Sequence, residues 1–230
     1  DITGAWCKHC PRVSYKLEQL KKQTDQVVVV AAHYGDALQF AKVSEMSNLF
    51  GLTGYPWAQV NRTNRWNESA SAITSLLNDK AKAGVAIESS VSGNTLSVNF
   101  KAKFAEDFSD LKYVVFLLED DIKLDQRQWE GGDYGYGRGT DRDGDGRIWL
   151  VNFNHTDVLR HSFTSSPLGE SIPSSSSKKG STFEKSLSFE IPSTYNKDKL
   201  KLVGIVVKKD NKVINSRLSE LSKTQSFEEL

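Results

Sequence analysis

The chain has 230 residues, a length that is large for one domain and comfortable for two. Its 30 basic side chains nearly balance 29 acidic ones, so no basic surface predicts binding to nucleic acid. No apolar run approaches the roughly 18 residues that a membrane-spanning helix needs. We therefore expect no nucleic acid partner and no segment that spans a membrane directly.

Residues 1–83 alternate between helix and strand signals. Apolar residues at helical spacing predict a helix over residues 11–24, and Pro11 suits its first turn because a missing N–H costs little there. The elements expected next are a buried strand at 27–33, a helix capped by Asp36 and ended by Gly51 and Gly54, a strand at 57–61 and a helix at 68–83. This alternation predicts an α/β layer domain at residues 1–83.

Residues 84–230 change to a pattern of strands. Apolar and polar residues alternate on both sides of Ser92-Gly93-Asn94, which predicts a hairpin with one solvent-exposed face. Further strands are expected at residues 112–118, 148–153, 158–163, 183–191, 200–208 and 212–218. Several short strands without helices predict an all-β antiparallel sandwich, immunoglobulin-like, as a second domain at residues 84–230.

Both cysteines of the chain lie in one motif, W-C-K-H-C-P at residues 6–11. A zinc site needs four ligands, which the chain lacks near this motif, and Pro11 stands where covalent haem attachment needs histidine. Two interpretations stay open: an inert pair of core cysteines, or a redox dithiol. The ring between Cys7 and Cys10 is too small to restrain the unfolded chain much, which favours the redox pair.

A helix that begins just after Cys7 would place its unpaired N–H groups beside this thiol. Such sites lower a thiol pKa from about 8.5 to about 3.5–7.5, so Cys7 is the predicted nucleophile. Cys10 lies within the first turn and is predicted to attack the mixed disulfide and release the substrate. Lys8 and His9 add positive charge beside the thiolate, or else are two solvated loop residues.

The first domain resembles thioredoxin. A W-C-x-x-C-P motif that opens a helix is followed by a buried strand, a helix and then T-G-Y-P at residues 53–56. The resemblance implies a cis Pro56 that faces the dithiol, with Trp6 and Tyr55 at the substrate. It also implies that Asp1, six residues before Cys7, is a buried acid that assists deprotonation of the resolving cysteine. The alternative for Asp1 is a plain surface carboxylate.

The position of His9, just before the second cysteine, resembles that of the histidine in disulfide isomerases and periplasmic oxidases. Reducing thioredoxins carry Gly-Pro between their cysteines instead. The resemblance therefore implies a reduction potential in the oxidising half of the family's range of about −270 to −120 mV.

Nearly the whole chain resembles the thioredoxin-like 28-kilodalton outer membrane proteins of Bacteroidetes. Their pattern runs from T-G-x-W-C-x-x-C-P into a β-sandwich, and this chain has that start at residues 3–11. Weaker matches to that family's sandwich motifs lie at residues 114–122, Gln126 and residues 155–160. The resemblance implies a location in the cell envelope, in the periplasm or at the outer membrane surface. Because the sequence opens directly before the motif, we expect an upstream segment with an export signal or a lipid anchor.

Residues 129–147 depart from that family's pattern and are interpreted as an inserted loop. The loop ends in D-R-D-G-D-G-R, in which Asp141, Asp143 and Asp145 have the spacing of a calcium-binding loop. The three carboxylates, with the carbonyl of Arg147, would supply oxygen ligands to Ca²⁺. Asn152 stands where such loops carry a bidentate glutamate, so a solvated Asp/Gly turn stays the alternative.

Aromatic residues lie among glycines at the start of the same loop. Trp129, Tyr134 and Tyr136 are expected either to bind a partner or to cover the end of the sandwich. The lone histidines His33 and His155 are expected to be structural.

Two functions are predicted from these residues. The first is a cell-envelope thiol–disulfide oxidoreductase, oxidase- or isomerase-like, that acts on protein thiols and disulfides and needs no cofactor for its redox chemistry. The second is a non-catalytic surface binding module in which the thioredoxin fold is a scaffold. Loss of activity on replacing Cys7 would distinguish the first from the second.

Overall fold

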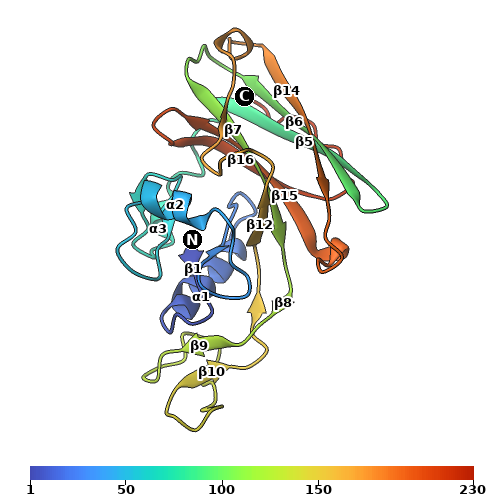
Figure 1. Ribbon diagram of the computed structural model, residues 1–230. Coiled ribbons are helices and arrows are strands. Elements are labelled where there is room, and N and C mark those ends of the chain that lie inside the picture. The colour runs from blue at the N-terminus through green and yellow to red at the C-terminus, as the bar shows by residue number, and fades with distance from the viewer. The chain divides into compact units, whose positions relative to one another are not determined.

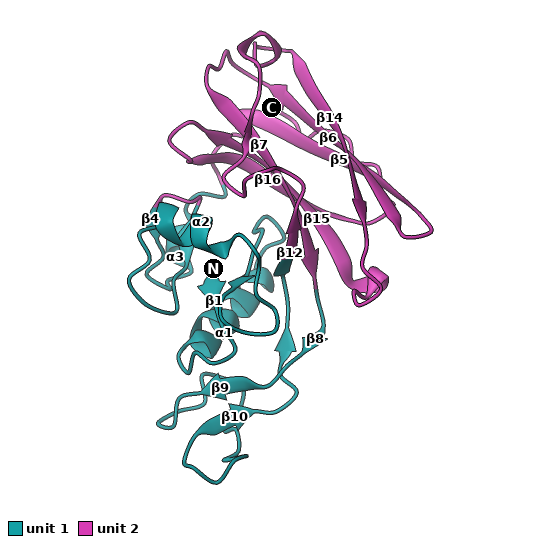
Figure 2. Cartoon of the chain, viewed as in Figure 1, with its two compact units in different colours: residues 1–60, 64–77, 120–159 teal, residues 61–63, 78–119, 160–230 magenta.

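The computed structural model describes all residues, 1–230, and they form two compact units (Figures 1 and 2). Unit 1 comprises residues 1–60, 64–77 and 120–159, and unit 2 comprises residues 61–63, 78–119 and 160–230. This division differs from a single boundary at residue 84, because the chain returns to unit 1 after residue 119. The inserted loop at 129–147 therefore belongs to the unit that carries both cysteines.

Unit 1 is built from short elements around one 12-residue helix. Helix α1 (Cys10–Lys21) lies in sequence between β1 (Ile2–Thr3) and β2 (Ala32–His33), which pair in parallel. The helix expected at 11–24 is thereby confirmed. The other elements of unit 1 are α2 (Val43–Leu49), α3 (Ser71–Thr74) and the antiparallel pairs β3 (Gln59–Val60) with β4 (Asn64–Arg65), β8 (Ile122–Lys123) with β11 (Asn154–His155), and β9 (Gln126–Gln128) with β10 (Ile148–Leu150).

The second expected helix is shorter than predicted, because Asp36 does not cap it. Helix α2 begins only at Val43. The Asp36 carboxylate instead accepts hydrogen bonds from the backbone N–H groups of Leu38 (2.8 Å) and Ala5 (2.6 Å). A short side chain that bonds the backbone two residues on stabilises a turn in place of a helix.

Two other expectations for unit 1 are wrong in extent. Only Ala32–His33 of the strand expected at 27–33 form a ladder, and Ala31 adds a single bridge to Val158. Only Ser71–Thr74 of the helix expected at 68–83 are helical, and none of these residues is buried. A single turn without a buried face gains little against the free-energy cost of helix nucleation.

Unit 2 consists of two antiparallel sheets. The expected hairpin is confirmed: Ser92 pairs with Thr95 across a turn in which Gly93 has a φ of 62°. One sheet has the order β14 (Thr182–Glu190), β6 (Thr95–Phe104), β5 (Ala83–Ser92). The other has the order β12 (Val158–Ser162), β7 (Leu111–Glu119), β15 (Leu200–Lys208), β16 (Val213–Glu220), with β13 (Glu170–Ser171) also paired to β7. Two short 3₁₀ helices, η1 (Ser174–Ser176) and η2 (Lys197–Lys199), lie in the connections.

The two sheets of unit 2 share one hydrophobic core. Phe100 and Phe104 of β6 belong to the same buried cluster as Tyr113 of β7 and Val206 of β15. Strands β7 and β15 are buried on both faces, which explains their near-continuous apolar sequences. The expected two-layer β arrangement is thus present. None of the chain's helices is both long and apolar enough to span a membrane.

Candidate functional site

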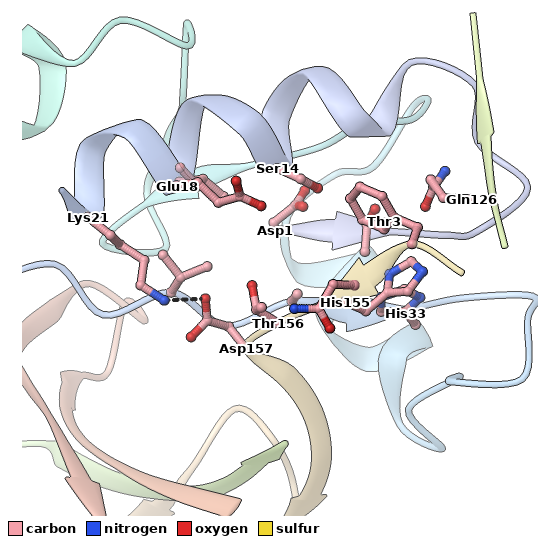
Figure 3. A pocket seen from close by; sticks show the side chains of 15 residues that line it. Asp1, Thr3, Ser14, Glu18, Lys21, His33, Gln126, His155, Thr156 and Asp157 are labelled. Carbon is pink, nitrogen blue, oxygen red and sulfur yellow. Dashed lines mark hydrogen bonds and ion pairs between the residues drawn. The ribbon is translucent and has the colours of Figure 1, made fainter. Parts of the chain in front are cut away.

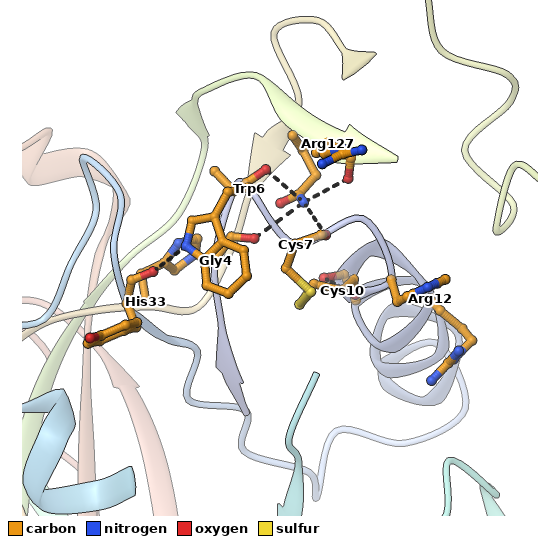
Figure 4. Close-up of a disulfide and its surroundings, with 12 residues drawn as sticks. Gly4, Trp6, Cys7, Cys10, Arg12, His33 and Arg127 are labelled. Carbon is orange, nitrogen blue, oxygen red and sulfur yellow. Dashed lines mark hydrogen bonds between the residues drawn. A yellow bond between two sulfur atoms is a disulfide. The ribbon is translucent and has the colours of Figure 1, made fainter. Parts of the chain in front are cut away.

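The two cysteines form a disulfide at the start of helix α1 (Figure 4). Their sulfur atoms are 2.09 Å apart, and α1 begins at Cys10 with Pro11 in its first turn. Both cysteines are buried, and Cys7, at 5% exposed, is the more accessible residue, against 1% for Cys10. His9 is the N-cap residue but makes no side-chain capping hydrogen bond, and the first turn holds no acidic residue. The positive end of the helix dipole therefore faces the cysteine loop without an internal counter-charge.

A buried glutamine from β9 holds the backbone of the cysteine loop. The Nε2 group of Gln126, a residue only 3% exposed, donates to the carbonyls of Cys7 (3.0 Å) and Ala5 (3.1 Å). The N–H of Arg127 also donates to the Ala5 carbonyl, at 2.7 Å. The hydrogen bonds donated by Gln126 are the dashed lines that meet at one nitrogen beside Cys7 in Figure 4. The sequence marked Gln126 only through a family likeness and gave no sign of this role.

The side chains of Trp6 and Tyr55, predicted from distant segments, contact each other. The Trp6 ring meets the Tyr55 ring edge-on at 4.9 Å, and its Nε1–H donates to the carbonyl of Tyr34 at 2.8 Å. The Tyr55–Pro56 peptide bond is cis, as expected. Trp6 is 41% exposed. An aromatic contact therefore joins the residue before Cys7 to the residue before Pro56.

The aromatic residues of the inserted loop pack on helix α1. The Tyr134 hydroxyl lies 2.6 Å from Nδ1 of His9, and the Tyr136 hydroxyl donates to the Glu18 carboxylate at 2.6 Å. The Trp129 ring lies 5.9 Å from the His9 ring and stacks on Tyr134. The expectation that these residues cover the end of the sandwich is wrong.

A glycine explains why the loop approaches the helix so closely. A Cβ atom at Gly135 would lie 2.4 Å from the ring of Tyr15 on α1, and the φ of Gly135 is 90°. Only glycine tolerates both conditions without strain.

Asp1 lines a small polar cavity behind α1 (Figure 3). The cavity has a volume of about 30 Å³, enough for a water molecule or two. Ser14 also lines it, and its hydroxyl lies 3.4 Å from the carbonyl of Cys10. Other polar residues around the cavity are Thr3, Glu18, Lys21, His33, Gln126, His155 and Asp157. One carboxylate oxygen of Asp1 is buried, so Asp1 is not a plain surface residue.

His33 and His155 are buried side by side near that cavity. Their ring centres are 5.0 Å apart, and Nδ1 of His33 lies 2.7 Å from the Asp36 carboxylate. Burial, and next the neighbouring His33, lower the pKa of His155 to about 4. Neither histidine contacts the disulfide in the structure, in keeping with the structural role expected for them.

The acidic residues of the inserted loop bond within the loop. The Asp141 carboxylate accepts from the N–H groups of Asp145 (3.1 Å) and Gly146 (3.0 Å). Asp143 pairs with Arg142, and Asp145 pairs with Arg147. The side chains are not gathered as a group of three or more that could hold a metal ion. Calcium binding at this loop stays a prediction.

Calcium binding can be tested by melting. If Asp141, Asp143 and Asp145 reorient around Ca²⁺, adding calcium at 100 times its dissociation constant should stabilise the protein by about 2.7 kcal/mol. The measurement is the melting temperature with calcium and with chelator, with magnesium as the control. Equal melting temperatures in all three solutions would leave only the solvated turn.

The chain was compared with known proteins. No curated protein matches it in sequence. The solved structure of HBP35 of Porphyromonas gingivalis has a TM-score of 0.73 at 16% identity, over 96% of this chain and 74% of that one. This likeness concerns the fold. A domain of the outer membrane lipoprotein Omp28 from the same organism has a TM-score of 0.37 at 12% identity, over 62% of this chain and 90% of that one.

A family model described as outer membrane protein Omp28 matches residues 43–225. The match covers most of the chain and begins after the cysteine motif, so it includes nearly all of unit 2 and much of unit 1. The chain therefore belongs to the Omp28 family of outer membrane proteins, which places it in the cell envelope.

Proposed function

We propose that this protein is a thiol–disulfide oxidoreductase of the cell envelope and that unit 1 is an abbreviated thioredoxin-like domain. One observation carries the proposal: the only two cysteines form a disulfide at an uncapped helix N-terminus, with Cys7 the more accessible of the two. The parallel β1–β2 pair around α1 supports the fold assignment. The cell envelope also permits disulfides to form and persist.

The proposed reaction is disulfide exchange with a client protein. A client thiolate attacks the sulfur of Cys7, the Cys7–Cys10 bond breaks, and Cys10 leaves as a thiolate. A second client thiolate then attacks the client sulfur of the mixed disulfide and releases Cys7. The client loses two electrons and gains a disulfide, and the protein becomes a dithiol. In the reverse direction Cys7 attacks a client disulfide and Cys10 resolves the adduct.

Neighbouring residues have defined roles in this proposal. The amide end of α1 stabilises the Cys7 thiolate. Trp6 and Tyr55 offer aromatic surface to the client next to Pro56. Asp1 is assigned the proton of Cys10 in the reverse direction, when Cys10 resolves the adduct; it lines the same cavity as Ser14, whose hydroxyl contacts the Cys10 carbonyl.

The acidity of Cys7 tests this proposal. In the reduced protein, the alkylation rate of Cys7 plotted against pH should have a midpoint well below 8, because the helix N-terminus favours the thiolate. Mass spectrometry after limited alkylation identifies which cysteine has reacted. A midpoint near the free-thiol value of about 8.5 would contradict the proposal.

A further inference from the structure

The inserted loop reaches His9, the residue directly before α1. His9 lies between Cys7 and Cys10 in the motif, and its Nδ1 atom is 2.6 Å from the Tyr134 hydroxyl. Trp129 stacks on Tyr134 with the ring planes 24° apart, which fixes the phenol ring. None of the steps proposed above uses this contact.

The chemistry of the two rings indicates which atom donates. A phenol O–H is more acidic than the N–H of a neutral imidazole, and an imidazole nitrogen accepts a hydrogen bond better than a phenol oxygen does. The Tyr134 O–H therefore donates to Nδ1 of His9. The Arg12 guanidinium lies 5.9 Å from the centre of the Tyr134 ring and adds positive charge near His9.

A hydrogen bond donated to Nδ1 requires the neutral imidazole, because the charged ring has no lone pair there. The surroundings of His9 also favour the neutral imidazole on balance. Partial burial, and next the charges of Lys8 and Arg12, lower the pKa of His9, while Glu130 raises it. Glu130 is itself paired with Lys8 at 3.1 Å, which reduces its influence.

We propose that Tyr134 is a positioning residue that holds His9 neutral, with its proton on Nε2. The second half of the inference rests on the proposed function: a neutral His9 stabilises the Cys7 thiolate less than an imidazolium would. The inserted loop thereby moderates the oxidising power that the C-K-H-C motif alone would give.

The first test needs no redox chemistry. The pKa of His9 is measured by NMR titration in the oxidised protein, for wild type, Tyr134→Phe and Tyr136→Phe. Loss of a net hydrogen bond should raise the pKa of His9 by about half a unit to one unit in Tyr134→Phe. Tyr136→Phe removes a hydroxyl from the same loop, bonded to Glu18 instead, and should leave the pKa of His9 unchanged. An unchanged or lowered pKa of His9 in Tyr134→Phe would overturn the inference.

The second test follows the effect to the dithiol. In the reduced protein, Tyr134→Phe should lower the pKa of Cys7, measured by alkylation against pH. In a His9→Gln background the same substitution should have no effect on Cys7. A shift of equal size in both backgrounds would show that Tyr134 does not act through His9. If the pKa of His9 rises as expected but Cys7 titrates near 8.5 in every variant, the assignment of Tyr134 to His9 stands and the proposed function fails.

Discussion

Replacing Cys7 by serine should reduce the oxidation and isomerisation of a client to the rate of the buffer alone. Cys7 is the sulfur that exchanges with the client, and serine cannot form a disulfide. The measurement is the recovery of activity from scrambled ribonuclease in a glutathione buffer. Wild type should accelerate recovery clearly above the buffer, and Cys7→Ser should not.

Replacing Cys10 by serine should have a different effect. Cys7 can still attack a client disulfide, but no second thiol is present to resolve the adduct. The mixed disulfide should therefore accumulate and appear on a non-reducing gel as a species that dithiothreitol releases. Ser47→Ala, which removes a hydroxyl bonded to the carbonyl of Val43 within α2, is the matched control and should behave as wild type. Wild-type rates in Cys7→Ser would contradict the enzyme, and inactivity of the wild type would favour a binding module on a thioredoxin-like scaffold.

The long strands of unit 2 could be predicted from the sequence because each follows one local rule, whereas the two-residue β13 was not expected. Alternation of apolar and polar residues marks β5 and β6, and a Gly-Asn turn joins them. The fully buried β7 and β15 are nearly continuous apolar runs. Neither signal depends on contacts with distant residues, so the ends of these strands lie within one or two residues of their expected positions.

The helices of unit 1 could not be predicted as well, because side chains compete with the helix for the backbone. Asp36 is a good capping residue in isolation. In the structure its carboxylate bonds Ala5, 31 residues earlier, as well as Leu38. Apolar spacing predicts a helix but does not report such a long-range acceptor.

Only the residues of the cysteine site that follow a local pattern could be predicted, because long-range contacts again supply the others. Cys7, Cys10 and Trp6 are adjacent in sequence, and Pro56 follows from a known pattern. Gln126 and Tyr134 reach the site only because residues 120–159 return to unit 1. The sequence marked Gln126 only through a family likeness, and its burial, which requires hydrogen-bond partners for the amide, appears only in the structure. Its partners are backbone carbonyls, which no side-chain pattern reveals.

Lowering the pH from about 7 to about 4 should destabilise unit 1 through His155. Burial, and next the charge of His33, depress the pKa of this residue in the folded state to about 4, against about 6.5 when unfolded. Below about pH 6.5, His155 therefore binds a proton in the unfolded chain but not in the folded chain. The free energy of unfolding falls as the pH falls. The stabilisation is complete above the unfolded pKa and is lost as the pH falls through the folded value. A difference of this size corresponds to about 3 kcal/mol.

Tryptophan fluorescence isolates this effect, because unit 1 holds all five tryptophans, Trp6, Trp57, Trp66, Trp129 and Trp149. Urea unfolding of the oxidised protein at several values between pH 7 and pH 4 gives the slope of stability against pH. His155→Gln keeps a donor for the Leu124 carbonyl, which His155 Nε2 contacts at 3.2 Å, but it removes the titration. Its slope should be smaller than that of wild type, even if its stability at pH 7 is lower. His161→Gln, in unit 2, is the control and should keep the wild-type slope. Equal slopes for wild type and His155→Gln would show that carboxylates alone cause the acid sensitivity of unit 1.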